Sequence, residues 1–178
     1  MDLENFQYPI GRMRFEEHYS MTEITRNILI ISSLPAKLAN LVNDLAENQL
    51  ETPYRPEGWT VRQTVHHVAD SHANAYIRFH LAMTEDNPTI KPYKENLWAQ
   101  LADGKTTPVD WSLQMLKYLH LRWVVLLNSM TEADFARTYH HPESERNFTL
   151  AQIVALYAWH SEHHYAHIYQ LKIRENWL

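Results

Sequence analysis

Apolar residues recur every three to four positions in four stretches of this chain, which is the spacing of an amphipathic α-helix. The stretches cover residues 20–45, 60–83, 107–130 and 149–171. No segment keeps for long the period of two that marks a half-buried strand. We therefore predict an all-α protein, and four long helices joined by connections of unequal length predict a four-helix bundle.

The starts of these helices carry capping signals. Ser20, Thr60 and Thr149 each stand three residues before a Glu or Gln, which is the pattern of a capping box. Thr107 is expected to cap the third helix in the same way. Pro35 interrupts the first helix and supplies no backbone donor, so we expect that helix to be kinked or split there.

The connecting segments differ in length and character. Residues 1–19 show no clear period and predict an extended arm of a single domain that spans 1–178. Residues 86–104 form a long loop between the second and third helices, a candidate lid or pocket wall. Residues 131–137 predict a short turn of helix, and a polar loop with Tyr139-His140-His141-Pro142 follows.

Composition narrows the classes of function. The chain has 178 residues, no cysteine, three glycines and a formal net charge of −5. Disulfides and thiolate ligands are thereby excluded, and a glycine-rich phosphate loop or a nucleic-acid partner is not expected. The acidic N-terminus lacks the apolar core of a signal peptide, and no apolar run approaches the roughly 20 residues of a membrane span. We expect a cytoplasmic protein with no membrane partner.

Histidine is concentrated in the last helical stretch, which contains His160, His163, His164 and His167. Two i,i+4 pairs result, and such partners lie one above the other on one helix face, where both rings can reach a single metal ion. The alternative is a polar surface stripe, or buried histidines that each bond a neighbour. A further histidine-rich helix upstream favours the metal.

The second helix could supply a third imidazole from His66, His67 or His72. The centre of its apolar stripe lies nearest His72, whereas His66 lies nearly opposite and is expected to be solvated. His67 lies on the flank of the stripe. Periodicity alone therefore favours His72 and does not exclude His67. Three neutral imidazoles would leave a coordination position open for water or substrate, as in catalytic sites.

The second and last helices resemble the DinB/YfiT family. The likeness is carried by residues 58–63 (Gly-Trp-Thr-Val-Arg-Gln), by Val65 to His72 and by Tyr157 to Ile168, with shorter matches at Tyr8 to Gly11 and His141-Pro142. It extends over nearly the whole chain and points to the YfiT branch. The resemblance implies a four-helix bundle with one divalent metal held by one histidine of the second helix and an i,i+4 pair of the last.

Matched by motif, the implied ligands are His67, His160 and His164. The YfiT branch includes bacillithiol transferases and proteins named as metal-dependent hydrolases, and its members are commonly dimers. The resemblance thus implies a metal-dependent enzyme acting on a small molecule, and a homodimer. Zinc is the first choice of metal, with nickel or iron as alternatives.

Two nucleophiles fit an open three-histidine site, a small thiol or water. The thiol is slightly favoured, because no residue of the sequence stands out as the general base that hydrolysis usually needs. The alternative to an enzyme is a non-catalytic bundle with a structural metal or a small-molecule binding role. A closed fourth ligand, such as His163 or Asp70, would indicate that alternative.

Other polar side chains are weaker candidates. Asp70 could orient a ligand ring, and His163 could contact bound substrate. Glu162 is expected to be solvated rather than a general base, and His141 could face the mouth of the site. Three aromatic residues are expected to pack in the core rather than to line the pocket: Tyr76, Tyr157 and Trp159.

Overall fold

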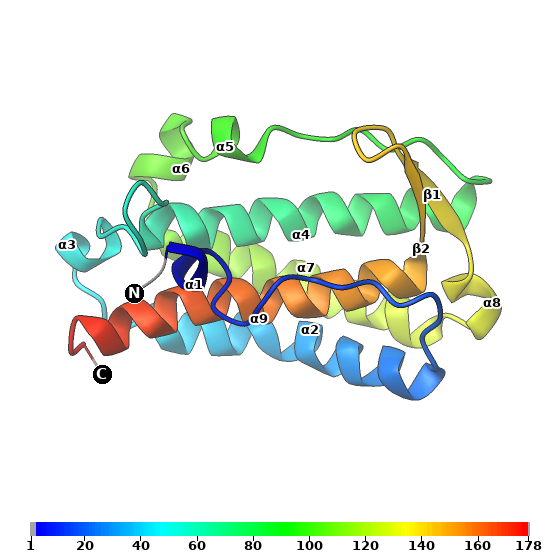
Figure 1. The fold of residues 1–178 in the computed structure, drawn as a ribbon, viewed down its shortest axis with the longest axis horizontal. Coiled ribbons are helices and arrows are strands. Elements are labelled where there is room, and N and C mark those ends of the chain that lie inside the picture. Colours follow the sequence, from blue (N-terminus) through cyan, green and yellow to red (C-terminus); the bar gives the residue numbers. More distant parts are fainter. Residues whose placement is uncertain (1–2, 178) are drawn as a thin grey trace.

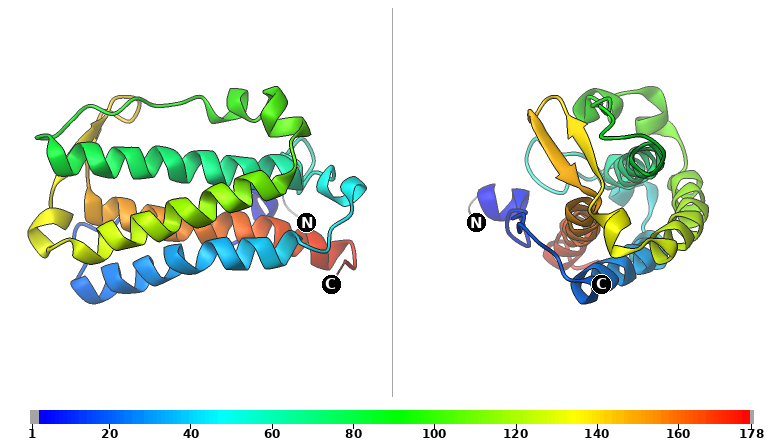
Figure 2. Two further views of the ribbon diagram at one scale, coloured as in Figure 1. Left: turned by 180° about the vertical axis from the view of Figure 1, so that it is seen from behind. Right: turned by 90° about the vertical axis from the view of Figure 1, so that its right-hand side faces the viewer.

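Four long helices lie side by side in the computed structural model, which describes residues 3–177 (Figure 1). They are α2 (Met21–Val42), α4 (Val61–Thr84), α7 (Val109–Ser129) and α9 (Leu150–Arg174). Helix α2 packs on α7 and α9, and α4 packs on the same two helices from the other side (Figure 2). The predicted four-helix bundle is therefore confirmed.

Five short helices and a β-hairpin in residues 3–177 accompany the four long helices. The short helices are α1 (Leu3–Gln7), α3 (Glu47–Leu50), α5 (Glu95–Trp98), α6 (Ala102–Thr106) and α8 (Glu132–Phe135). Strands β1 (Thr138–His141) and β2 (Arg146–Thr149) form an antiparallel hairpin in which Thr138 pairs with Thr149. The expected polar loop at residues 139–142 is thus wrong, because this segment pairs with the residues that lead into α9.

The predicted caps hold at three of the four long helices. Ser20, Thr60 and Thr149 each complete a capping box with the side chain three residues later. The cap expected at Thr107 is wrong, since α7 begins after Pro108 without a side-chain cap. The Thr107 hydroxyl instead donates to the Asp103 carbonyl in α6.

Helix α2 runs without a break through Pro35, so the expected split is wrong, and the expected kink stays a prediction. Proline lacks the N–H that would bond the carbonyl four residues earlier, which belongs to Ile31. That carbonyl lies 2.8 Å from Nδ1 of His120, a buried side chain of α7. A partner from another helix therefore replaces the missing backbone bond, and the helix continues.

The segments outside the bundle pack down on α4 and α9. Residues 3–19 contain α1, which the expected extended arm did not include, and the arm runs along α9 (Figure 1). The segment between α4 and α7 is held to α4 where the Gln63 side chain donates to the Ala99 carbonyl at 2.7 Å. It also bridges to β1 through Thr89 and His140. It therefore forms a wall over one side of α4.

The core is aromatic at its centre. Trp123 is fully buried and meets Phe79 and Tyr157 edge-on, with ring centroids 5.4 and 5.6 Å apart. Within residues 3–177 no helix has both the length and the apolar character needed to cross a bilayer.

Candidate metal centre

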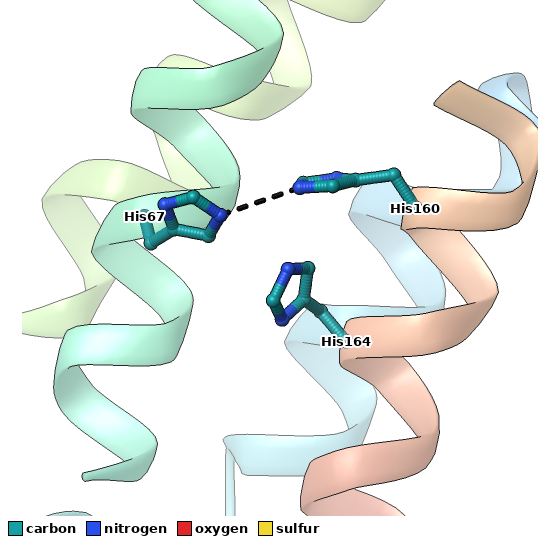
Figure 3. Close-up of side chains that lie close together, drawn as sticks. All are labelled: His67, His160 and His164. Carbon is teal, nitrogen blue, oxygen red and sulfur yellow. Dashed lines mark hydrogen bonds between the residues drawn. The ribbon is translucent and has the colours of Figure 1, made fainter. Parts of the chain in front are cut away.

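Helices α4 and α9 turn three imidazole rings toward one point: His67 from α4, and His160 with His164 from α9 (Figure 3). One ring nitrogen of each lies within 4.8 Å of the others. Nε2 of His67 and Nε2 of His160 face each other at 3.3 Å. Because His160 and His164 are an i,i+4 pair, α9 alone stacks their rings, and the packing of α4 supplies the third.

Burial keeps these rings neutral. It lowers the pKa of His67 to about 3, and it lowers the pKa of His160 and of His164 well below the ordinary value, with neighbouring imidazoles adding to the effect. A neutral imidazole has the lone pair that a metal ion needs. Three such nitrogens at this spacing are a donor set that fits a divalent ion of the zinc type.

A chain of hydrogen bonds behind His160 fixes which of its nitrogens carries the proton. The Ile31 carbonyl can only accept, so Nδ1–H of His120 is the donor and Nε2 of His120 is an acceptor. Nδ1–H of His72 then donates to that Nε2 at 2.9 Å. Nε2 of His72 in turn accepts from Nδ1–H of His160 at 3.2 Å. Nε2 of His160 is therefore the unprotonated nitrogen, and it faces His67.

A second chain of hydrogen bonds fixes which nitrogen of His164 carries the proton. The Gln7 carbonyl accepts from Nε2–H of His167 at 3.2 Å, which leaves Nδ1 of His167 as an acceptor. Nδ1–H of His164 donates to it at 3.4 Å. Nε2 of His164 is thereby left unprotonated. Partners that fix the tautomer of a ligand ring in this way are a regular feature of histidine metal sites.

In the metal-free protein, His160 and His164 should both be Nδ1–H tautomers with unprotonated Nε2. Long-range ¹⁵N–¹H correlation spectra of histidine-labelled protein would report this directly. Substitution His72→Phe should release the tautomer of His160 but leave His164 unchanged, because the second chain does not pass through His72. Protonated Nε2 on both rings in the wild type would contradict the two hydrogen-bonded chains.

The other histidines of α4 do not join the group. His72 is fully buried between His120 and His160, so it lies behind the site and not in it. The expectation of a solvated His66 is wrong, since this residue is 6% exposed. Its ring nitrogens meet the Ser112 hydroxyl at 2.7 Å and the Thr107 carbonyl at 3.2 Å.

The weaker candidate residues do not join the three imidazoles. No hydrogen bond joins the Asp70 carboxylate to His67 within residues 3–177, and burial together with Asp103 raises the pKa of Asp70 to about 6. His163 stacks on Trp159, and its Nδ1 is buried without a hydrogen-bond partner. Glu162 faces α2, where its Oε1 lies 2.7 Å from Lys37 Nζ. Within the described chain, none of these side chains is a fourth member of the ligand group.

Two cavities meet at His160. The first holds about 420 Å³ and is walled by the N-terminal arm, the loop before α4 and the histidine face of α9. The second holds about 570 Å³ and lies between α4, α9, the hairpin and the segment before α5. Tyr157 packs in the core as expected and also lines the second cavity, whereas Trp159 lines the first cavity, contrary to the expectation for that ring. His141 lines the second cavity, beside His160.

Glu95 and Asn96 line both cavities, at the junction marked by His160. The Glu95 side chain is exposed to solvent, yet partial desolvation by the surrounding protein raises the pKa of its carboxyl, and the nearby Glu143 adds to the shift. Glu95 could not be predicted from the sequence, because it lies in the irregular connection, where no periodicity indicates which side chains face the site. The only signal was the length of that connection.

Comparisons with known proteins agree with this architecture. Residues 31–168 match the family model of the DinB superfamily. A protein of Bacillus mycoides (strain KBAB4) named "Putative metal-dependent hydrolase" is 54% identical over 175 residues, covering 98% of this chain and all of that protein. A protein of Bacillus cereus (strain 03BB102) with the same name is 51% identical over the same span.

The structure is also similar to that of YfiT from Bacillus subtilis. The two chains superpose with a TM-score of 0.96 at 45% sequence identity, over 98% of this chain and 99% of the other. YfiT is described as "a probable metal-dependent hydrolase with an unusual four-helix bundle topology".

Proposed function

Because this chain belongs to the DinB superfamily, and because three neutral imidazoles converge between two of its helices, we propose that it is a metal-dependent hydrolase. The proposed ligands are His67, His160 and His164, with zinc as the first choice of ion and nickel or iron as alternatives. The single observation that carries the proposal is the approach of these three rings to within 4.8 Å at the junction of two cavities. The names of the relatives support the same reaction class.

The chain's own residues supply what hydrolysis needs around an ion. When bound, a divalent ion would polarise the substrate carbonyl and lower the pKa of an attacking nucleophile. The Trp59 ring lies 4.5 Å from the His67 ring and 6.4 Å from the His164 ring, so an apolar surface shields the ligand side from water. His160 lines both cavities, so substrate can reach it from either one.

We propose Glu95 as the general base that takes a proton from the attacking water. Its raised pKa moves the carboxyl toward the operating pH, which is favourable for proton transfer. Substitution Glu95→Gln should lower kcat for hydrolysis of p-nitrophenyl acetate by about 10²-fold, with zinc content unchanged. Steady-state kinetics beside elemental analysis would measure both quantities.

The control for this test is Glu17→Gln, because Glu17 is exposed and lines neither cavity. It should leave kcat within about twofold of the wild type. A kcat for Glu95→Gln as high as that of the control would remove Glu95 from the reaction. Zinc-loaded wild-type protein that hydrolyses no ester faster than metal-free protein would contradict the hydrolase itself.

A thiol transferase is the second candidate, and the two-cavity arrangement favours it specifically. A transferase needs room for a thiol and for an electrophile on either side of the reacting atoms, and both cavities adjoin His160. Turnover of a bimane electrophile by zinc-loaded protein with a low-molecular-weight thiol tests this reading. If no thiol raises turnover above the ester-hydrolysis rate, the transferase reading fails.

We also propose that the chain works as a homodimer on a small-molecule substrate, without a nucleic-acid partner. Exposed apolar side chains on α7 support a second copy as partner, because Trp111, Met115, Tyr118 and Val125 follow one another at spacings of four, three and seven residues. Light scattering coupled to size-exclusion chromatography would determine the mass in solution.

A further inference from the structure

A buried arginine in the second cavity has no acidic partner in the part of the chain that the structure describes. Arg78 of α4 is 9% exposed and lines that cavity. None of the ion pairs formed by residues 3–177 involves Arg78. Its guanidinium donates to the Lys91 carbonyl at 3.2 Å, which satisfies one of its five N–H groups. Charged side chains are rarely buried without a counter-charge, so this cation needs an explanation.

Two further polar atoms in the same cavity also lack partners. The Tyr93 hydroxyl and Nδ1 of His141 are buried, and neither makes a well-formed hydrogen bond within residues 3–177, although Ser71 lies close enough to Tyr93 to lower its pKa slightly against the effect of burial. Both groups can donate a hydrogen bond, and both come from segments that face α4 across the cavity. Buried polar atoms are nearly always bonded, so a pair of unsatisfied atoms beside an unpaired cation indicates a missing ligand.

The residues around Arg78 do not neutralise it. The Arg78 side chain also lies within hydrogen-bonding reach of the Tyr139 and Tyr157 hydroxyls, but burial raises the pKa of both, so they are uncharged at neutral pH and supply no counter-charge. Glu95 and Glu143 line the outer part of the cavity, where they are exposed, and neither forms an ion pair with Arg78. The inner end of the cavity is therefore positively charged.

The position of Arg78 connects this end to the imidazole cluster. His67 and Arg78 are eleven residues apart on α4, which places them about 20° apart around the helix and about 16 Å apart along it. They thus share the face of α4 that lines the site, with Ser71 between them. A molecule in the second cavity can contact Arg78 at one end and approach His160 at the other.

We propose that Arg78, with the Tyr93 hydroxyl and His141 Nδ1, forms a subsite for an oxyanion of the substrate, a carboxylate or a phosphate. The planar fork of an arginine binds both groups through two parallel hydrogen bonds. The substrate is therefore an elongated anion whose reacting group lies away from its charge. This inference rests on the proposed function for the reacting end, but the subsite can be tested without the metal.

Isothermal titration of the metal-free protein tests the subsite with three probes: adipate, inorganic phosphate and the neutral analogue adipamide. The buffer contains no other carboxylate or phosphate. The wild type should bind at least one anion at least tenfold more tightly than adipamide. Tighter binding of adipate would identify a carboxylate as the natural group, and tighter binding of phosphate a phosphoryl group.

Variants assign the binding to particular side chains. Arg78→Met should weaken anion binding at least tenfold, and the exposed arginine variant Arg122→Met should leave it unchanged. Tyr93→Phe removes only an unpaired hydroxyl, so it should fold like the wild type and still weaken binding severalfold. Circular dichroism would reveal whether Arg78→Met folds. If it does not, the Tyr93→Phe variant still tests the subsite.

Two results would overturn the subsite: a wild type that binds neither anion more tightly than adipamide, or a folded Arg78→Met that binds them as the wild type does. Anion binding by a protein with no metal-dependent hydrolysis would keep the subsite and refute the hydrolase. Metal-dependent hydrolysis without anion binding would keep the hydrolase and refute the subsite.

Discussion

Metal-free protein should unfold cooperatively when the pH is lowered from 7.5 to about 5. The reason is the number of histidines that are buried and neutral. Burial lowers the pKa of His67 and of His167 to about 3, and that of His120 and of His163 to about 4. In the unfolded chain each of these side chains titrates near 6.5.

The direction in which stability changes with pH follows from the number of protons that the folded and unfolded states bind. Below about pH 6.5 the unfolded chain binds protons at these four positions and the folded chain does not, so stability is full above that pH and falls as the pH drops. At pH 5 each buried neutral ring lowers the free energy of unfolding by about 2 kcal/mol, and the four together lower it by about 8 kcal/mol. This loss is comparable to the 5–15 kcal/mol that typically stabilises a domain. The lowered pKa values of the remaining buried rings act in the same direction.

Far-UV circular dichroism during an acid titration would measure this transition, and its steepness would give the number of protons taken up. We expect at least three. His18→Gln is the matched control, because His18 is exposed and lies outside the cluster. It should leave the midpoint unchanged. A metal-free protein that keeps its helical signal at pH 4 would contradict the buried neutral state of the rings.

The bundle could be predicted from the sequence because its signals are local. Capping boxes at Ser20, Thr60 and Thr149 involve residues three positions apart, and the apolar stripes repeat within each helix. The continuity of α2 could not be predicted. It depends on His120, which is 85 residues from Pro35 in sequence, and a bond between helices leaves no local pattern.

The candidate site could also be predicted from the sequence only in part. The pair His160 and His164 could be found from its i,i+4 spacing within one helix. The choice of His67 over His72 required the family resemblance, since the apolar stripe of α4 points into the core, where His72 bonds His120. His67 lies on the flank that faces α9.

Glu95 and Arg78 were beyond sequence reasoning for different reasons. Glu95 lies in a segment without periodicity, whose path is set by contacts such as that between Gln63 and the Ala99 carbonyl. Arg78 lies on a helix with clear periodicity, where a charged residue is normally assigned to solvent. Among residues 3–177, its burial without an acidic partner distinguishes it.

Substitution His160→Ala should remove most of the zinc from the protein. His160 is one of only two proposed ligands on α9, and the remaining pair, His67 and His164, would come from separate helices. Loss of groups that merely orient a ligand costs about 10–100-fold in metal affinity, so loss of a ligand should cost on the order of 10²-fold or more, about 3 kcal/mol. Hydrolysis should fall with the zinc content.

The three-imidazole centre is tested most directly by zinc content, measured by elemental analysis after equilibrium dialysis for the wild type, His160→Ala and the control His163→Gln. His163 lies on the same helix and outside the ligand group, so the control should retain its zinc. We expect about one ion per chain for the wild type and the control, and a small fraction of that for His160→Ala. Equal zinc content in His160→Ala and the wild type would contradict the three-imidazole centre.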